Sequence, residues 1–176
     1  QINVSFQNLR ITRVSDNKSI LINGTQTYTN VSGGLLINLP VLNTITHTIT
    51  SSNMSVTFDN NSQRTWQVAR QRVFTYNNGV AITVTGLHTE NGISGIAEWG
   101  TNRFGNSFTS AITQPLVFRQ DCSFRVGSGK VEHRTAYFNA TATFGLDASG
   151  NPTGCPGASS YYMKIVWTGP AGNTRS

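Results

Sequence analysis

Apolar and polar residues alternate along most of this chain, and this feature limits its fold more than any other. Near the N-terminus Ile2, Val4 and Phe6 occupy every second position. Because side chains of a β-strand point alternately to opposite faces, a period of two predicts strands with one buried and one exposed face. The same period recurs in "MSVTF" (54–58), "VAITVTG" (80–86), "TAYFNATATFGL" (135–146) and "YYMKIVW" (161–167). No segment shows a convincing helical period, so we expect an all-β chain of antiparallel strands.

Turn signals separate these segments. Asn78-Gly79 lies between two alternating runs, and Asn-Gly is the strongest short signal for a β-hairpin. "TENGIS" (89–94) carries a second Asn-Gly, "NRFGNS" (102–107) predicts a longer turn, and residues 147–157 are too rich in Gly and Pro to pair. We therefore expect hairpins and meanders that form a β-sandwich or a strongly curved sheet. Residues 1–176 fit a single β domain, and the alternative is two β-halves that meet near residues 60–72.

The polar positions are filled mainly by uncharged residues. Charged residues make up 11% of the chain, against about 25% in ordinary domains, and Asn, Thr, Ser and Gly replace them. In "LNTITHTITS" (42–51) threonine takes every second position, so one strand face there is wholly threonine. Such a face could bind ice if several strands repeated it in register, but only "TYT" (27–29) and "TVT" (83–85) offer partners. We expect a structural, solvent-facing surface instead.

Two cysteines, Cys122 and Cys155, bear on the compartment. In a chain of this composition they most simply form one disulfide, which indicates an oxidising environment, and two free buried thiols are the alternative. No run of 18 apolar residues is present, so no transmembrane segment is expected. The chain begins with Gln1 and shows no signal-peptide pattern, which is typical of a processed product.

No motif points to catalysis or to a cofactor. The seven carboxylates are scattered, and no nucleophile elbow or phosphate-binding loop occurs. His88 and Glu90 share a strand face, but with Glu132 and His133 they form no metal set of known spacing, so no metal site is predicted. Arginines and Trp66 share a face in "RTWQVARQR" (64–72), and this pattern favours arginine packing over an aromatic ring rather than nucleic-acid binding.

Aromatic residues leave carbohydrate binding open. A sugar-binding module stacks tryptophan or tyrosine on pyranose rings and uses nearby amides and hydroxyls for hydrogen bonds. Trp99, beside Glu98 and just before the turn with Asn102 and Arg103, is the best candidate for an exposed ring. Aromatic residues are also ordinary core residues of β proteins, so the glycan contact by Trp99, Asn102 and Arg103 is the rival interpretation.

Longer motifs follow one another in the second half of the chain. They are "NRFGNSF" (102–108), "ITQPL" (112–116), "CSFRVGSG" (122–129) and the run from "FG" (144–145) to Cys155. In this order they resemble a large group of secreted or lipid-anchored β-rich surface proteins of Bacteroidota. Gly127 and "LDASGNPTG" (146–154) depart from the group pattern, and the final short strand usual in the group is absent after "WTGPAGNTRS". Either this strand is missing from the chain, or a neighbour supplies it.

The resemblance implies export to the cell surface, with outer-membrane association as one form of it, and it implies no enzymatic activity. We therefore expect an extracellular structural or adhesive β protein without a cofactor. Self-association through strand edges into a fibre or layer is the favoured partnership, with Ile2, Val4 and Phe6 as the candidate assembly strand. The alternative is that "QINVSF" (1–6) pairs within its own domain and that the chain end is an ordinary frayed terminus. Carbohydrate binding to extracellular glycans is the alternative function, and a secreted glycan-active enzyme is a distant third.

Overall fold

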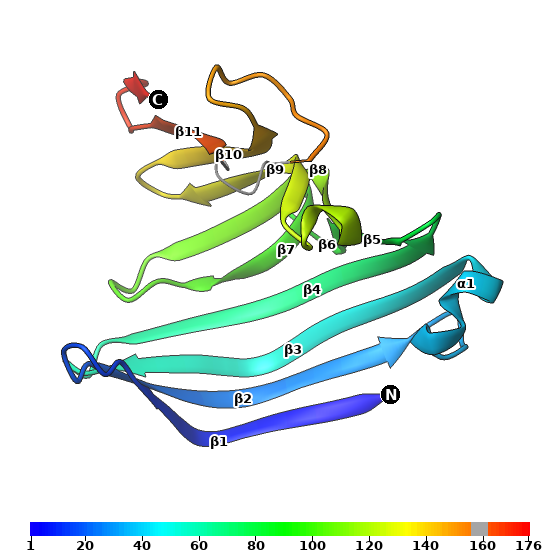
Figure 1. Ribbon diagram of the computed structural model, residues 1–176. Coiled ribbons are helices and arrows are strands. Elements are labelled where there is room, and N and C mark those ends of the chain that lie inside the picture. The colour runs from blue at the N-terminus through cyan, green and yellow to red at the C-terminus, as the bar shows by residue number, and fades with distance from the viewer. Residues whose placement is uncertain (156–161) are drawn as a thin grey trace.

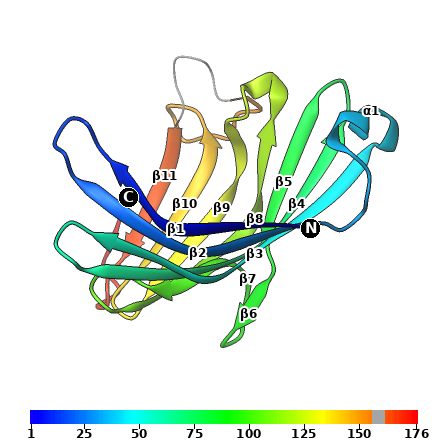
Figure 2. The ribbon, with the colours of Figure 1, turned by 90° about the horizontal axis from the view of Figure 1, so that it is seen from below.

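The chain forms one antiparallel sheet, stacked from β1 at the bottom of Figure 1 to β11 near the top. The computed structural model describes residues 1–155 and 162–176, and it is 66% strand and 6% helix. The prediction of an all-β antiparallel fold is confirmed, and of the two expected architectures the chain adopts the curved sheet (Figure 2). Tyr161, expected in the last long strand, lies outside the described residues.

Twelve strands make up the sheet within the described residues. In chain order they are β1 (Ile2–Thr12), β2 (Ser19–Asn30), β3 (Thr44–Phe58), β4 (Gln63–Tyr76), β5 (Val80–Gly86), β6 (His88–Glu90), β7 (Ile93–Thr101), β8 (Ser107–Arg119), β9 (Val126–Thr135), β10 (Asn139–Leu146), β11 (Tyr162–Thr168) and β12 (Thr174–Arg175). Residues 60–72, the expected boundary between two halves, hold the turn after β3 and most of β4, which pairs with strands on both sides.

The middle of the sheet divides into two branches. One part of β4 pairs with β5 and the other with β7, and β8 pairs in the same way with both strands. The strands β4, β5, β8 and β7 therefore close a four-stranded ring, which we call the fork. Where β5 and β7 meet, a Cβ atom on Gly86 would lie only 2.6 Å from the carbonyl carbon of Ile96. Only glycine fits this contact at Gly86.

One face of the sheet is apolar. Registers place Ile49 beside Tyr28, Ile45 beside Phe74, and Ile112 beside Val131 on this side, which we call the apolar face. Its best-buried residues include Ile45, Ile49, Met54, Val68, Val84 and Ile112. The opposite, polar face carries the threonines. Thr27 pairs with Thr50 and Thr29 pairs with Thr48, so the threonine run of β3 continues into β2.

Bulges keep the apolar residues on one face along the long strands. In β1 the register shifts between Phe6 and Leu9, where Asn8 has φ 52°. In β3 it shifts between Thr50 and Met54, where Asn53 has φ 56°. Asparagine tolerates this left-handed conformation better than most residues. Each extra residue restores the alternation, so apolar residues on both sides of the bulge reach the same face.

The two Asn-Gly pairs expected in turns both form hairpin turns, but only one has the predicted two-residue geometry, and a third pair, Asn23-Gly24, lies within β2. Asn91 and Gly92 have φ 50° and 77° and join β6 to β7 directly, as a type I′ turn requires. Asn78 and Gly79 lie in a three-residue loop between β4 and β5, closed by a hydrogen bond from Asn77 N to Gly79 O of 3.1 Å. The loop after β10 contains one isolated bridge between Leu146 and Pro152, although no pairing was expected there.

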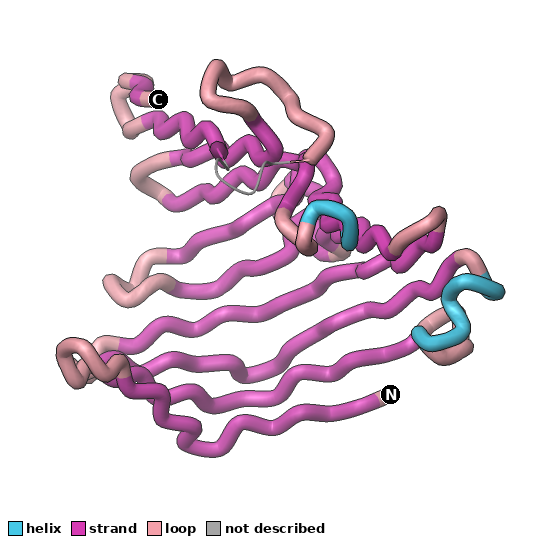
Figure 3. Tube along the Cα trace, in the orientation of Figure 1, coloured by secondary structure: helices cyan, strands magenta, loops and turns pink. Residues whose placement is uncertain are grey.

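Within residues 1–155 and 162–176, helical structure is limited to short connections (Figure 3). The segments are η1 (Leu36–Asn38), α1 (Leu39–Leu42) and η2 (Gln120–Cys122). Leu39 is only 2% exposed, so α1 covers one end of the sheet near β3 and β4. Among the described residues, none of the helices has the length and apolar character needed to cross a membrane.

Candidate functional site

Among the described residues, both edges of the sheet are open. β1 pairs only with β2, and its apolar-face residues Ile2 and Ile11 are 66% and 50% exposed. At the other end β12 pairs with only the last two residues of β11, and Met163 and Ile165 are 50% and 48% exposed. Within the part of the chain that the structure describes, most of β11 therefore has no strand partner on its outer side.

The candidate assembly strand lies in β1. Ile2, Val4 and Phe6 pair with residues of β2 in the chain's own sheet, so their strand offers its outer edge. In this structure the segment pairs within its own sheet, and the expectation that it completes a neighbour's sheet stays a prediction. Its three side chains lie on the apolar face, and Val4 is 37% exposed.

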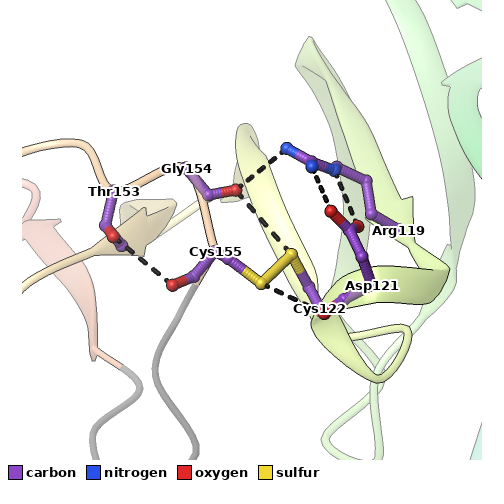
Figure 4. Close-up of a disulfide and its surroundings, with 6 residues drawn as sticks. All are labelled: Arg119, Asp121, Cys122, Thr153, Gly154 and Cys155. Carbon is purple, nitrogen blue, oxygen red and sulfur yellow. Dashed lines mark hydrogen bonds and ion pairs between the residues drawn. A yellow bond between two sulfur atoms is a disulfide. The ribbon is translucent and has the colours of Figure 1, made fainter.

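The predicted disulfide is present. It joins Cys122 in η2 to Cys155 in the loop after β10, with a Cα–Cα distance of 5.3 Å (Figure 4). Arg119 pairs with Asp121 and also donates a hydrogen bond of 3.3 Å to the carbonyl oxygen of Gly154. The Cys122 side chain is buried. These contacts fasten the long loop to the end of β8, and no free cysteine occurs among the described residues.

The candidate glycan residues do not converge on one surface. Trp99 lies on the polar face of β7, where its ring stacks on His88 with a centroid distance of 3.9 Å. Asn102 Oδ1 accepts hydrogen bonds from the backbone N–H groups of Phe104 and Asn106, so its side chain holds the turn. Arg103 lies over the ring of Phe58, which is on the apolar side of β3. Trp99 and Arg103 thus belong to opposite faces.

The four residues considered for a metal set have separate partners and do not form one cluster. His88 Nε2 lies 3.8 Å from Glu90, but Glu132 is bound by Arg134 and His133 Nδ1 lies 2.9 Å from Ser110 Oγ. No group of three or more His, Cys, Asp or Glu side chains suited to a metal occurs in residues 1–155 and 162–176.

Charged side chains gather on the apolar face at the fork. Glu98 of β7 forms ion pairs with Arg70 and, at 3.9 Å, with Arg64, both of β4. The Arg64 guanidinium also lies 4.8 Å from the centre of the Phe108 ring. The sequence indicated that these arginines share a face, which is confirmed, and that they pack over an aromatic ring, which holds for Arg64 over Trp66 and Phe108, whereas Arg70 pairs with Glu98. The sequence did not identify Glu98 as their partner, because Arg70 and Glu98 are 28 residues apart and only the pairing of β4 with β7 brings them together.

An aromatic row runs from this cluster to the end of β11 that pairs with β12. His133 stacks on Phe108 at 5.4 Å and lies 5.9 Å from Phe138, which in turn lies 6.1 Å from Trp167. Trp167 is 38% exposed. The row links four parts of the chain across the apolar face, so the surface at the β11 edge is continuous with the core.

Burial lowers the pKa of two histidines on the apolar face. The pKa of His133 is lowered from 6.5 mainly by burial and further by the positive charge of Arg64, although Glu98 opposes the change. Burial and Arg72 lower the pKa of His47 in the same way. On the exposed β1–β2 loop, the hydrogen bond from Arg13 lowers the pKa of Asp16. Because the pKa values of His133 and His47 lie below 6.5, both histidines are uncharged near neutral pH.

Comparison with known proteins identified no relative. No protein-family model matches the chain, and neither do the curated proteins or the solved structures with which it was compared. The function has to be inferred from the geometry of the chain itself.

Proposed function

We propose that this protein is a non-enzymatic structural or adhesive protein outside the cell, and that its copies associate through the edges β1 and β11. The observation that carries the proposal is that both ends of the sheet are open and carry exposed apolar residues on the same face. An edge strand exposes a row of unpaired N–H and C=O groups, which a strand from another copy can satisfy.

The two edges are compatible with each other. If β1 of one copy pairs with β11 of the next, the apolar side chains of both strands can stay on one face. Ile2 and Val4 would then lie beside residues such as Ile165. Full burial of an exposed side chain of this size contributes about 1.5–3 kcal/mol, and each of these contributes only part of that, because Ile2, Val4 and Ile165 are 66%, 37% and 48% exposed. Because the two edges differ, the contact is heterologous, and heterologous contacts propagate into filaments unless they close into a ring.

Little protects either edge. Proteins that remain monomeric guard edge strands with inward-pointing charges, proline or covering loops. The side chains on the apolar side of β1 are Ile2, Val4, Phe6, Leu9 and Ile11, without a charge. On β11 the lysine, Lys164, alternates with Met163 and Ile165 and therefore points to the polar face. The backbone edges are accessible to a partner strand.

The disulfide supports an extracellular location. Disulfides persist in oxidising compartments and are rare in the cytosol, and the Cys122–Cys155 bond joins two loops that no strand pairing connects. A surface rich in threonine and poor in charge also suits the outside of the cell. A bacterial cell surface, as the motif resemblance implies, is the proposed site of action.

A charge placed on the edge tests the association. Val4→Lys puts an ammonium group on the apolar side of β1, and Thr50→Lys adds the same charge on the polar face in the middle of the sheet. We expect wild type and Thr50→Lys to form concentration-dependent assemblies, measured by sedimentation velocity and electron microscopy. In Val4→Lys the association constant should fall at least about ten-fold, because a Lys side chain must be buried at the contact.

Two results would contradict the proposal. A monodisperse wild-type monomer at high concentration would remove assembly through the edges, and equal assembly of Val4→Lys and Thr50→Lys would place the contact elsewhere. Specific binding on a glycan array that Trp99→Ala abolishes would instead favour the carbohydrate-binding alternative.

A further inference from the structure

The fork leaves a hollow on the apolar face. β5 and β7 share the space between β4 and β8, and a hollow of about 400 Å³ lies beside the place where they meet. Its base is the buried cluster of Val84, Ala97 and Ile112. This volume lies in the range of about 300–1,000 Å³ that is usual for small-molecule sites.

The walls of the hollow are apolar on the side of β5 and β8. Ile82, Leu116 and Phe118 pack against the buried cluster and remain only partly buried themselves. Since these side chains belong to paired strands of the ring, the wall is preformed rather than created by a ligand. An alkyl or aryl group in the hollow would replace water against this wall.

The opposite side of the hollow is cationic. Arg70 and Arg72 of β4 reach it, together with Glu98 and Ser110. Glu98 is already engaged by Arg70 and Arg64. Arg72 takes part in no ion pair or side-chain hydrogen bond among the described residues, and its cross-strand neighbours are His47 and Val84. The guanidinium of Arg72, which lies beside the apolar hollow, therefore lacks a counter-ion among the described residues.

Two buried N–H groups of neighbouring arginines lack hydrogen-bond acceptors. The Nε atoms of Arg64 and Arg70 are buried and have no hydrogen-bond partner among the described residues. Buried polar atoms are almost always paired in folded proteins, so each unpaired one needs a specific cause. Arg64, which does not line the hollow, and Arg70 share the carboxylate of Glu98, so Arg72 is the guanidinium of the hollow that an added oxyanion can pair with.

We propose that the hollow binds an aliphatic monocarboxylate, with its carboxylate on Arg72 and its alkyl chain over Val84 and Leu116. The planar guanidinium can donate two parallel hydrogen bonds to a carboxylate, which makes arginine suited to this head group. A neutral alcohol of the same chain length would keep the apolar contacts and lose the charged ones. This site is independent of the proposed association through the strand edges.

Calorimetric titration of the intact, oxidised protein with sodium octanoate and with 1-octanol tests the site. We expect one octanoate per chain and at least about ten-fold weaker binding of 1-octanol, because charge-assisted hydrogen bonds are lost. Arg72→Gln should weaken octanoate at least about ten-fold, and Arg72→Lys should restore part of the affinity. Arg10→Gln removes the same charge from an exposed guanidinium that binds Ser19, and it should leave octanoate binding unchanged.

Three results would overturn the proposal. They are the absence of octanoate binding at millimolar concentration, equal affinities for octanoate and 1-octanol, and unchanged octanoate affinity in Arg72→Gln. Circular dichroism and thermal melting of each variant show whether it is folded. If Arg72→Gln does not fold, the comparison of octanoate with 1-octanol on wild type and on Arg72→Lys still decides between the two outcomes.

Discussion

Substituting alanine for Gly86 tests the fork directly. Gly86 ends β5 where β7 approaches it, and an added Cβ would lie 2.6 Å from the carbonyl carbon of Ile96 and closer still to the carbonyl group of Gly95. Ordinary contacts of a Cβ atom begin at about 3.4 Å. Because both neighbours are backbone groups, no side-chain rotation relieves the clash, and β5 and β7 have to separate.

Two effects of this substitution oppose each other. Alanine reduces the conformational entropy of the unfolded chain, which stabilises a protein by about 0.4–1 kcal/mol where the fold accepts it. Inserting a methyl group into a filled space costs about 1–3 kcal/mol, and more where the backbone must move. Separation of the strands also weakens neighbouring hydrogen bonds of about 1 kcal/mol each. We therefore expect Gly86→Ala to lower the free energy of unfolding by about 2–3 kcal/mol.

Urea denaturation followed by far-ultraviolet circular dichroism measures this difference. Gly154→Ala is the matched control, because among the described residues other than its two chain neighbours no atom lies within 4 Å of an added Cβ at Gly154. The control should leave the free energy of unfolding unchanged or raise it by up to about 1 kcal/mol. If Gly86→Ala proves as stable as the control, β5 and β7 do not meet at this residue and the ring is not closed as described.

Two further predictions concern the disulfide and pH. Replacing Cys122 and Cys155 together by alanine should lower the free energy of unfolding by about 3–4 kcal/mol, because the disulfide closes a loop with a sequence separation of 33. Urea denaturation measures this loss, and a loss below about 1 kcal/mol would contradict the prediction. The fold keeps the pKa of His133 below 6.5, so the unfolded chain binds the proton first. Stability should therefore fall as the pH drops from 7.5 to 5.5, and a His133→Gln variant that shows the same decline would refute this assignment.

The period of two in the sequence predicts most of the strands, because alternation is a local property of each segment. The register between strands is harder to predict from the sequence. Ile49 and Met54 lie five positions apart and would point to opposite faces of a regular strand, yet the bulge at Asn53 brings them to the same face. Asn53 resembles many other asparagines in this chain, so nothing in the sequence distinguishes it as a bulge residue.

The candidate sites were predictable to different degrees. The disulfide followed from having only two cysteines, whereas the ion pairs of Glu98 depend on the non-local pairing of β4 with β7. The hollow depends on that pairing too, because it exists only where β5 and β7 meet. Trp99 was expected to present an exposed ring, whereas it is half-buried and stacks on His88 of the short β6–β7 hairpin.

The threonine pairs of β2 and β3 affect how this protein responds to its medium. Thr27 beside Thr50 and Thr29 beside Thr48 hydrate the polar face through hydroxyl groups, which carry no charge at any physiological pH. Salt screens charges on a surface, but it has no such effect on hydroxyl groups. Hydration of this threonine-covered part of the polar face is therefore expected to change little between low and high salt.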